Sequence, residues 1–256
     1  MLPQVNIIRA KNGDFLSFYE RAGISGVLTA HGIWDEATIH IAKALVDASS
    51  KKPVIFDVGA NMGTFTIPLS HHILSRNGVL HAFEPQRVIY YQLCGNIFLN
   101  RVENAFAHKM ALSTDVGEQE IDILNYHSAF NIGAYSLVPG KDNQEKNISK
   151  EKCIFSTLDN IFNDLSISLI KIDVEGMEID VLSGGIKRLA ANDYPPIIFE
   201  SNNSDAKAQL VYELLTKLGY GIIKYAEEDC LAQHPKWDSE IELISNGEHL
   251  LISKIR

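Results

Sequence analysis

The stretch Val54-Ile55-Phe56-Asp57-Val58-Gly59-Ala60-Asn61-Met62-Gly63 decides the fold. It begins with a short apolar run and breaks into glycines just before residues 67–74, whose apolar side chains recur at helical spacing. This order predicts a buried strand, a tight loop and a helix. Glycine has no Cβ and tolerates unusual backbone angles, so a loop of this composition lets a ligand approach the backbone closely.

The strand-and-helix pattern continues along the chain. Strands are predicted at residues 79–83, 106–112, 169–172 and 197–199, with closing strands at 222–223 and 250–252. Helices are predicted at about 34–46, 88–100, 178–191 and 210–218. Because the strands are apolar throughout and alternate with helices, they indicate an α/β fold with a parallel sheet that is buried on both faces.

We expect one domain over residues 1–256, because no internal repeat, low-complexity tract or linker interrupts the chain. Residues 1–52 are predicted to form an N-terminal helical extension, and residues 53–256 the core. A polar stretch at about 126–152 is predicted to be an insertion, either a functional lid or a surface loop. Within it, residues 131–136 form the segment that we expect to contact an acceptor.

Composition excludes several classes of protein. The chain of 256 residues is 46% hydrophobic, which is enough for a sizeable core. Its net charge of -9 leaves no basic footprint for a phosphate backbone, so no nucleic-acid partner is expected. Cys94, Cys153 and Cys230 are too far apart for a metal knuckle and too few for a disulfide framework. Without a leader-like N-terminus or a long apolar run, a cytoplasmic protein with no membrane partner is predicted.

Acidic residues follow the predicted strands. Asp57 and Glu84 come at the ends of the first two, Asp173 and Glu175 follow another, and Glu200 follows the next. Open parallel sheets bind ligands beyond the carboxyl ends of their strands. Glu84 is placed where a carboxylate can accept both hydroxyls of a ribose. The set therefore predicts a cofactor that contains a nucleoside, although any one of these acids can also be a helix cap or a solvated loop residue.

The glycine loop favours one kind of nucleoside cofactor. A dinucleotide-binding loop reads G-x-G-x-x-G and aims its amides at a pyrophosphate, whereas here Asn61 stands at the middle glycine. Asp57 would also repel a pyrophosphate. S-adenosylmethionine carries a sulfonium and an ammonium group, so an acidic site suits it better. A nicotinamide-dependent oxidoreductase and a non-catalytic S-adenosylmethionine-binding module stay open as alternatives.

A series of short motifs occurs in a fixed order between residues 54 and 200. They are Phe56-Asp57-Val58-Gly59-Ala60-Asn61-Met62-Gly63, Ala82-Phe83-Glu84-Pro85, Asn96 with Asn100, Ala111-Leu112, Thr157-Leu158-Asp159, and Lys171-Ile172-Asp173-Val174-Glu175-Gly176 with Glu178 and Leu182. This series resembles the signature of the FkbM family of S-adenosylmethionine-dependent methyltransferases. The segment Gly32-Ile33-Trp34-Asp35-Glu36 is similar to one that often precedes the core in this family.

The resemblance implies a class I methyltransferase fold, a Rossmann-like three-layer sandwich whose sheet has six parallel strands and a last antiparallel one. It implies S-adenosylmethionine as cofactor and O-methylation of a hydroxyl on a sugar, glycan or secondary-metabolite acceptor. The implied cofactor-binding residues are Asp57, Gly59, Asn61 and Gly63 at the methionine end, Glu84 at the ribose, Ala60 and Pro85 beside them, and Met110, Ala111 and Leu112 near the adenine.

Catalysis of this reaction needs mainly alignment and the exclusion of water, because the sulfonium is already a good leaving group. A general base helps when the acceptor is a poorly acidic alcohol. The candidates are Asp173, Glu175 and Glu200, with His31 and His127 on flanking segments. Asp173 and Glu175 can instead cap the helix that begins near Glu178 or hold Lys171.

Two further possibilities concern the surroundings of the reacting atoms. Paired acids at this rim can gather a divalent cation that lowers the pKa of a coordinated hydroxyl, but no additional ligand motif supports a metal site, so no metal is predicted. Trp34 and Tyr126 are candidate aromatic walls of the site, although large aromatic side chains in such places are also common in plain packing.

Overall fold

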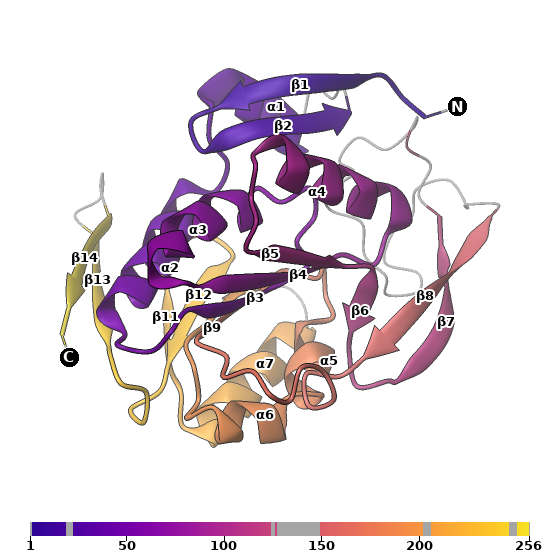
Figure 1. Cartoon of the computed structure of the whole chain (residues 1–256). Coiled ribbons are helices and arrows are strands. Elements are labelled where there is room, and N and C mark those ends of the chain that lie inside the picture. The colour runs from indigo at the N-terminus through magenta and orange to yellow at the C-terminus, as the bar shows by residue number, and fades with distance from the viewer. Residues whose placement is uncertain are drawn as a thin grey trace.

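A seven-stranded sheet forms the centre of the computed structural model, which describes residues 2–18, 23–123, 126, 149–201, 206–245 and 250–255 (Figure 1). Its strands are β3 (Val54–Val58), β4 (Val79–Phe83), β5 (Ala105–His108), β9 (Leu169–Ile172), β10 (Ile197–Glu200), β11 (Gly221–Lys224) and β12 (Asp229–Gln233). They lie in the order β11-β12-β10-β9-β3-β4-β5. All pairs from β5 to β10 are parallel, and β12 is antiparallel to both neighbours, as predicted.

Helices cover both faces of this sheet. One face carries α2 (Glu36–Ala48), α3 (Thr66–Ile73), which continues into a 3-10 turn (Leu74–Arg76), and α4 (Arg87–Leu99); the other carries α5 (Glu178–Ser183), α6 (Ile186–Ala191) and α7 (Ala206–Leu218) (Figure 1). Successive strand residues such as Ile55 and Phe56 belong to different core clusters, because side chains alternate across a strand. Among the described residues, no helix is long and apolar enough to cross a lipid bilayer.

The N-terminal extension differs from the prediction. Two strands, β1 (Val5–Ala10) and β2 (Gly13–Phe18), form a hairpin before α1 (Gly23–His31) and α2, so residues 1–52 are not purely helical. The hairpin packs on α4, where the Asn96 and Asn100 side chains accept hydrogen bonds from the amides of Leu16 (2.6 Å) and Asp14 (2.8 Å). The two asparagines of the family-like series therefore hold the extension on the core, a long-range contact that local periodicity does not reveal.

The predicted strand at 106–112 is divided between two sheets. β5 ends at His108, and β6 (Met110–Leu112) pairs with β8 (Lys150–Ser156), which also pairs with β7 (Gly117–Asp122). The end of the predicted insertion, residues 150–152, is thus part of β8. The acceptor-contacting segment 131–136 and His127 lie outside the described residues.

The closing strand of the main sheet is also different from the predicted one. β12 fills this place, with Cys230, Leu231 and Ala232 completely buried. Residues 250–252 belong instead to β14 (Leu250–Lys254), which pairs only with β13 (Ile241–Ser245) in the described part of the chain. Both segments are short apolar runs, and only their burial distinguishes them.

Candidate active site

A cavity of about 420 Å³ opens at the carboxyl ends of β3, β4, β9 and β10. Its size is that of sites for small molecules and cofactors. The predicted site residues that line it are Gly59, Ala60, Asn61, Glu84, Pro85, Met110, Ala111, Leu112, Asp173, Glu175 and Glu200. The sheet therefore brings the predicted catalytic residues into the same cavity as most of the predicted cofactor residues.

Glu84 organises one end of this cavity. Its carboxylate is 5% exposed and accepts the backbone N–H of Asn61 (3.1 Å) and of Gln86 (2.9 Å). The loop is fixed a second time, because the amides of Gly59 and Ala60 both donate to the Phe83 carbonyl at 3.0 Å. Burial raises the pKa of Glu84 to about 7, although these backbone hydrogen bonds oppose the shift. A buried carboxylate of this kind is stabilised in its charged form when a bound ligand donates hydrogen bonds to it.

Two predicted cofactor residues do not line the cavity. Asp57 is completely buried inside β3, where its carboxylate accepts the Thr66 hydroxyl at 2.6 Å and lies 3.8 Å from the Lys171 ammonium. Burial raises the pKa of Asp57. Gly63 is required for packing, since a Cβ there would come within 2.9 Å of Leu93 in α4. Both residues therefore stabilise the elements that form the cavity but do not line it themselves.

A glycine is required at position 59 for a different reason from the predicted one. Its φ of +81° lies in the left-handed region, and a Cβ at this position would come within 1.7 Å of the carbonyl oxygen of Asp173. The glycine thus allows the β3 loop to pass against the loop that follows β9. The absence of a Cβ therefore makes room for the backbone of this second loop.

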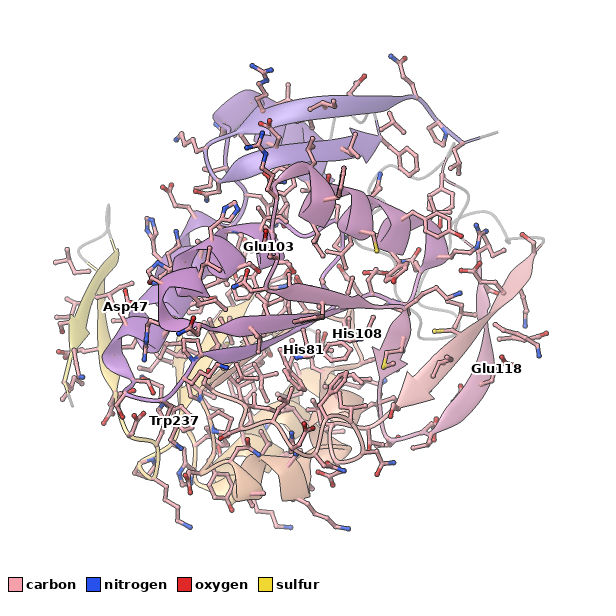
Figure 2. All side chains as sticks on the ribbon, in the orientation of Figure 1. Asp47, His81, Glu103, His108, Glu118 and Trp237 are labelled. Atoms are coloured by element: carbon pink, nitrogen blue, oxygen red, sulfur yellow. The ribbon has the colours of Figure 1, made fainter. Side chains whose placement is uncertain are left out.

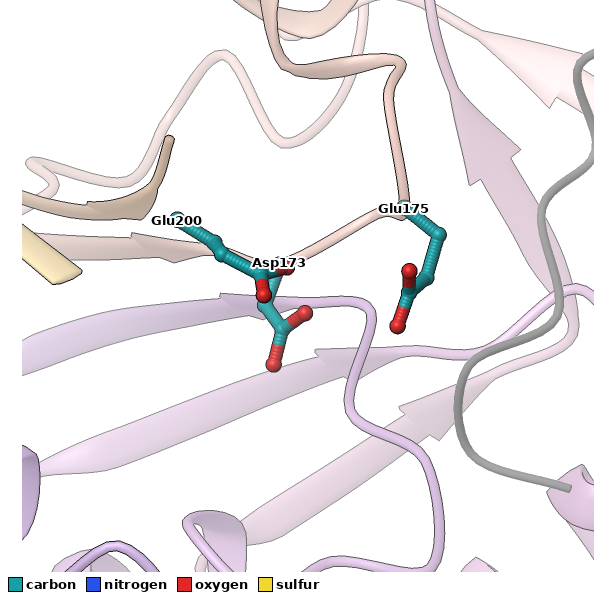
Figure 3. Close-up of side chains that lie close together, drawn as sticks. All are labelled: Asp173, Glu175 and Glu200. Atoms are coloured by element: carbon teal, nitrogen blue, oxygen red, sulfur yellow. The ribbon is translucent and has the colours of Figure 1, made fainter. Parts of the chain in front are cut away.

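Three carboxylates meet at the other end of the cavity (Figure 3). Asp173 and Glu175 come from the loop after β9, and Glu200 ends β10; one oxygen from each lies within 4.8 Å of the others. Glu175 has a φ of +54°, an uncommon conformation for a residue with a side chain, and Gly176 follows it with a φ of +100°. Such local strain is typical of functional sites.

Lys171 is the counter-charge next to this group. Its ammonium is 3.0 Å from Asp173, the contact that the alternative role of Asp173 as a partner of Lys171 requires. Burial by itself would lower the pKa of Lys171, but the Asp173 and Asp57 carboxylates raise it well above its ordinary value. In the described part of the chain, no basic side chain forms an ion pair with Glu200, which shares a hydrogen bond with Asp173 instead. Burial, followed by the charges of Asp173 and Glu175, raises the pKa of Glu200 to about 9.

The helix-cap alternative for the acids after β9 is wrong. Met177 occupies the N-cap position of α5, and no side-chain hydrogen bond caps it. The carboxylate of Glu178 organises the preceding loop instead, because it accepts the amides of Val174 (3.3 Å) and Gly176 (3.0 Å). Asp173 and Glu175 both line the cavity, and neither occupies the N-cap position of α5.

Residues 57–222 match the sequence model of the methyltransferase FkbM domain. The chain belongs to the FkbM methyltransferase family. It therefore contains an S-adenosylmethionine-dependent methyltransferase domain of the class I fold, with which its strand order agrees. The nicotinamide-dependent alternative is excluded by this membership.

Known proteins resemble parts of this FkbM methyltransferase. A Methanocaldococcus jannaschii tRNA(Phe) (4-demethylwyosine(37)-C(7)) aminocarboxypropyltransferase is 33% identical over 72 residues, which span 28% of either chain. Among solved structures, a Thermotoga maritima S-adenosylmethionine-dependent O-methyltransferase has a TM-score of 0.48 and 8% identity, with coverage of 97% of this chain and 79% of that one. The FkbM methyltransferase of Methylobacillus flagellatus has a TM-score of 0.45 and 17% identity, with coverage of 72% and 44%.

Other predicted residues of the FkbM methyltransferase fall into two groups. Trp34 lines the cavity, as predicted for an aromatic wall. Tyr126 instead packs on Phe18 with ring centroids 5.6 Å apart, and His31 ends α1 in an exposed position, so neither is part of the lining.

A pair of histidines lies away from this cavity. His81 of β4 and His108 of β5 are neighbours at the sheet edge (Figure 2), with ring nitrogens 3.0 Å apart. Burial lowers the pKa of His108 to about 4. Neither ring belongs to the cavity lining, so this pair does not serve as a base for methyl transfer.

Sequence reasoning missed several lining residues, of which Asp35, Lys171 and Glu228 carry charge. Asp35 follows Trp34 in the family-like segment before α2, and that similarity was a usable signal. Lys171 lies inside an apolar strand and is the first residue of the FkbM-like motif at residues 171–176. Glu228 directly precedes β12, whose position in the sheet was not predicted, so no sequence signal placed it at the site.

Replacing Glu200 by glutamine is expected to stabilise the ligand-free enzyme above about pH 5. Glu200 ionises near its ordinary value in the unfolded chain but only near pH 9 in the folded one, so the folded state binds more protons between these values and stability falls as pH rises. Water still reaches this side chain, so we expect a gain of about 2 kcal/mol, or about 4–8 °C in melting temperature, near pH 8 and none near pH 4. Identical melting curves at both pH values would contradict the burial-raised pKa.

Proposed function

We propose that this enzyme transfers the methyl group of S-adenosylmethionine to a hydroxyl oxygen of a small-molecule acceptor, such as a sugar, glycan or secondary metabolite. The observation that carries the proposal is the arrangement of the cavity, with the Glu84 end and the Asp173–Glu200 end joined in one space. A nucleoside-binding end next to a cluster of proton-accepting groups suits transfer between a cofactor and an acceptor.

The residues at the Glu84 end fit the cofactor. Both oxygens of Glu84 keep lone pairs that can accept ribose hydroxyls while they hold the Asn61 and Gln86 amides. Met110, Ala111 and Leu112 give the adjoining lining an apolar surface suited to an adenine ring. When bound, S-adenosylmethionine supplies an electrophilic methyl group on a positively charged sulfur.

The acids at the other end differ in their expected tasks. A raised pKa keeps Glu200 protonated at neutral pH, so Glu200 is suited to donate a hydrogen bond and not to act as a base. Asp173, which accepts a hydrogen bond from Lys171 at 3.0 Å, is the carboxylate we assign to take the proton of the acceptor hydroxyl. Glu175 lies beside it and is assigned to orient the acceptor.

A small acceptor is favoured over a nucleic acid. The chain has a net charge of -9, and the acidic lining of the cavity would repel phosphate groups. A cytoplasmic location stays a prediction from the sequence.

Cofactor binding tests this proposal most directly. We expect calorimetry to give a micromolar dissociation constant for S-adenosylmethionine and a loss of about 10- to 100-fold in Glu84→Gln, because the amide cannot accept all of the hydrogen bonds of the carboxylate. Wild-type affinity should also fall about tenfold per pH unit below pH 7, where Glu84 becomes protonated, and the variant should lose this dependence.

A matched surface variant completes this experiment. Glu118→Gln changes a half-exposed carboxylate in β7, outside the cavity, and should bind S-adenosylmethionine like the wild type. Unchanged affinity in Glu84→Gln would remove Glu84 from the cofactor site, and a complete lack of binding by the wild type would overturn the proposed function.

A further inference from the structure

The cavity lining contains many more acidic than basic side chains. Six acidic side chains contribute to it, namely Asp35, Glu84, Asp173, Glu175, Glu200 and Glu228, whereas Lys171 is the one basic side chain among the described lining residues. The charge of Lys171 is already shared between Asp173 at 3.0 Å and the buried Asp57 at 3.8 Å. Lys171 alone therefore does not balance the acids of this lining, even though Glu200 is protonated at neutral pH.

Most of these acids gather at the end of the cavity away from Glu84. Glu200 at the end of β10 pairs in register with Asp229 of β12, and the amide of Ser201 donates to the Glu228 carbonyl at 2.6 Å. Asp35 lies near the same region, because the hydroxyl of Thr38 in the first turn of α2 is 2.7 Å from the Tyr225 hydroxyl, and the Tyr225 amide donates to the Asp229 carbonyl at 3.0 Å. Carboxylates that are buried together in this way repel one another, and the repulsion is relieved when one of them takes up a proton, as Glu200 does, or when a cation lies among them.

The cofactor does not supply enough positive charge. S-adenosylmethionine brings a sulfonium and an ammonium but also a carboxylate, so its net contribution is a single positive charge. The same part of the lining contains Trp34 and Phe65, and the Lys171 ammonium already lies 5.7 Å from the centre of the Phe65 ring. Carboxylates and the face of an indole ring together stabilise an organic ammonium group well.

We propose that the methyl acceptor is itself a cation, an amino alcohol or amino sugar whose protonated amine is held by Glu228 and Asp35 while its hydroxyl faces Asp173. The inference rests on the proposed function, because it assigns the acceptor to the same cavity. A divalent metal ion is the less favourable occupant. Among the described residues, the three acids that can surround one ion are Asp173, Glu175 and Glu200, and the Lys171 ammonium lies 3.0 Å from the first of them.

Binding to the full-length enzyme saturated with S-adenosylhomocysteine tests the proposal. The probes are glucosamine and ethanolamine, each compared with its N-acetyl derivative and with the corresponding alcohol, glucose or ethylene glycol. Saturation-transfer NMR at low salt and neutral pH gives the affinities. We expect at least one amine to bind about tenfold or more tightly than its two neutral partners, and to lose this advantage at high salt, where charge attraction is screened.

Two neighbouring glutamates provide a matched pair of variants. Glu228→Gln removes a carboxylate of the lining, whereas Glu227→Gln changes the exposed residue next to it, which is not part of the lining. The first should lower amine affinity about three- to tenfold without changing binding of the neutral partners, and the second should leave both unchanged.

The outcomes separate this inference from the proposed function. Equal binding of amines and neutral partners, failure of every amine to bind, or equal effects of the two variants would overturn the cationic acceptor. Magnesium or manganese that binds in calorimetry and displaces the amine would overturn it in favour of a metal ion. If the neutral compounds are methylated as fast as the amines, the inference fails and the methyltransferase activity stands; if S-adenosylmethionine does not bind at all, the proposed function fails first.

Discussion

Asp173→Asn is expected to lower the rate of methyl transfer by about 10²- to 10⁴-fold while cofactor affinity stays within about threefold of the wild type. The carboxylate is assigned to take the acceptor proton, and an amide cannot do so. The shape of the side chain is retained, and Lys171 keeps Asp57 as a partner at 3.8 Å. The effect should therefore appear in turnover, measured as S-adenosylhomocysteine release with the best acceptor of the panel above.

Asp180→Asn is the matched control for loss of an ion pair. Asp180 lies in α5, 3.5 Å from the Lys207 ammonium, and is not part of the cavity lining. A partly exposed pair of this kind contributes little, so turnover and melting temperature should both stay close to the wild type. If Asp173→Asn retained full turnover, Asp173 would be a structural partner of Lys171, and Glu175 would become the base to test.

The second large effect is expected for Gly59→Ala. The new Cβ would lie 1.7 Å from the Asp173 carbonyl oxygen, so one of the two loops has to move. Neither moves freely, because the Asp173 amide donates to the Val58 carbonyl at 2.9 Å and the Gly59 amide donates to Phe83 at 3.0 Å. We expect the free energy of unfolding to fall by about 3–5 kcal/mol. We also expect the affinity for S-adenosylmethionine to fall by at least about 100-fold.

Gly117→Ala separates the steric clash from backbone strain. Gly117 also has a positive φ, +130°, but nothing lies within 4 Å of the place where its Cβ would be. This variant should lose only about 1 kcal/mol and bind the cofactor normally. If urea unfolding and calorimetry gave equal losses for the two variants, the close approach of the two loops would not be what requires Gly59.

Local sequence pattern was sufficient to predict part of this enzyme. An apolar run followed by an acid predicts a buried strand with a carboxylate at its end, and this was sufficient for Glu84, Asp173 and Glu200. The carboxyl ends of parallel strands meet at one edge of a sheet, so these side chains share a cavity although they are far apart in the chain. The glycine loop and the motifs that resemble the FkbM family also predicted the cofactor.

The remaining features depend on contacts between distant segments, which become visible in the folded structure. The hairpin of residues 5–18 is held by Asn96 and Asn100, and β12 rather than residues 250–252 closes the sheet, because only burial distinguishes one short apolar run from another. The ionisation of the acidic side chains also depends on the tertiary structure. Glu200 has the same side chain as any exposed glutamate, but the neighbours that the fold places around it raise its pKa to about 9, and a pKa depends on the whole surroundings of a group and not on its position in the chain.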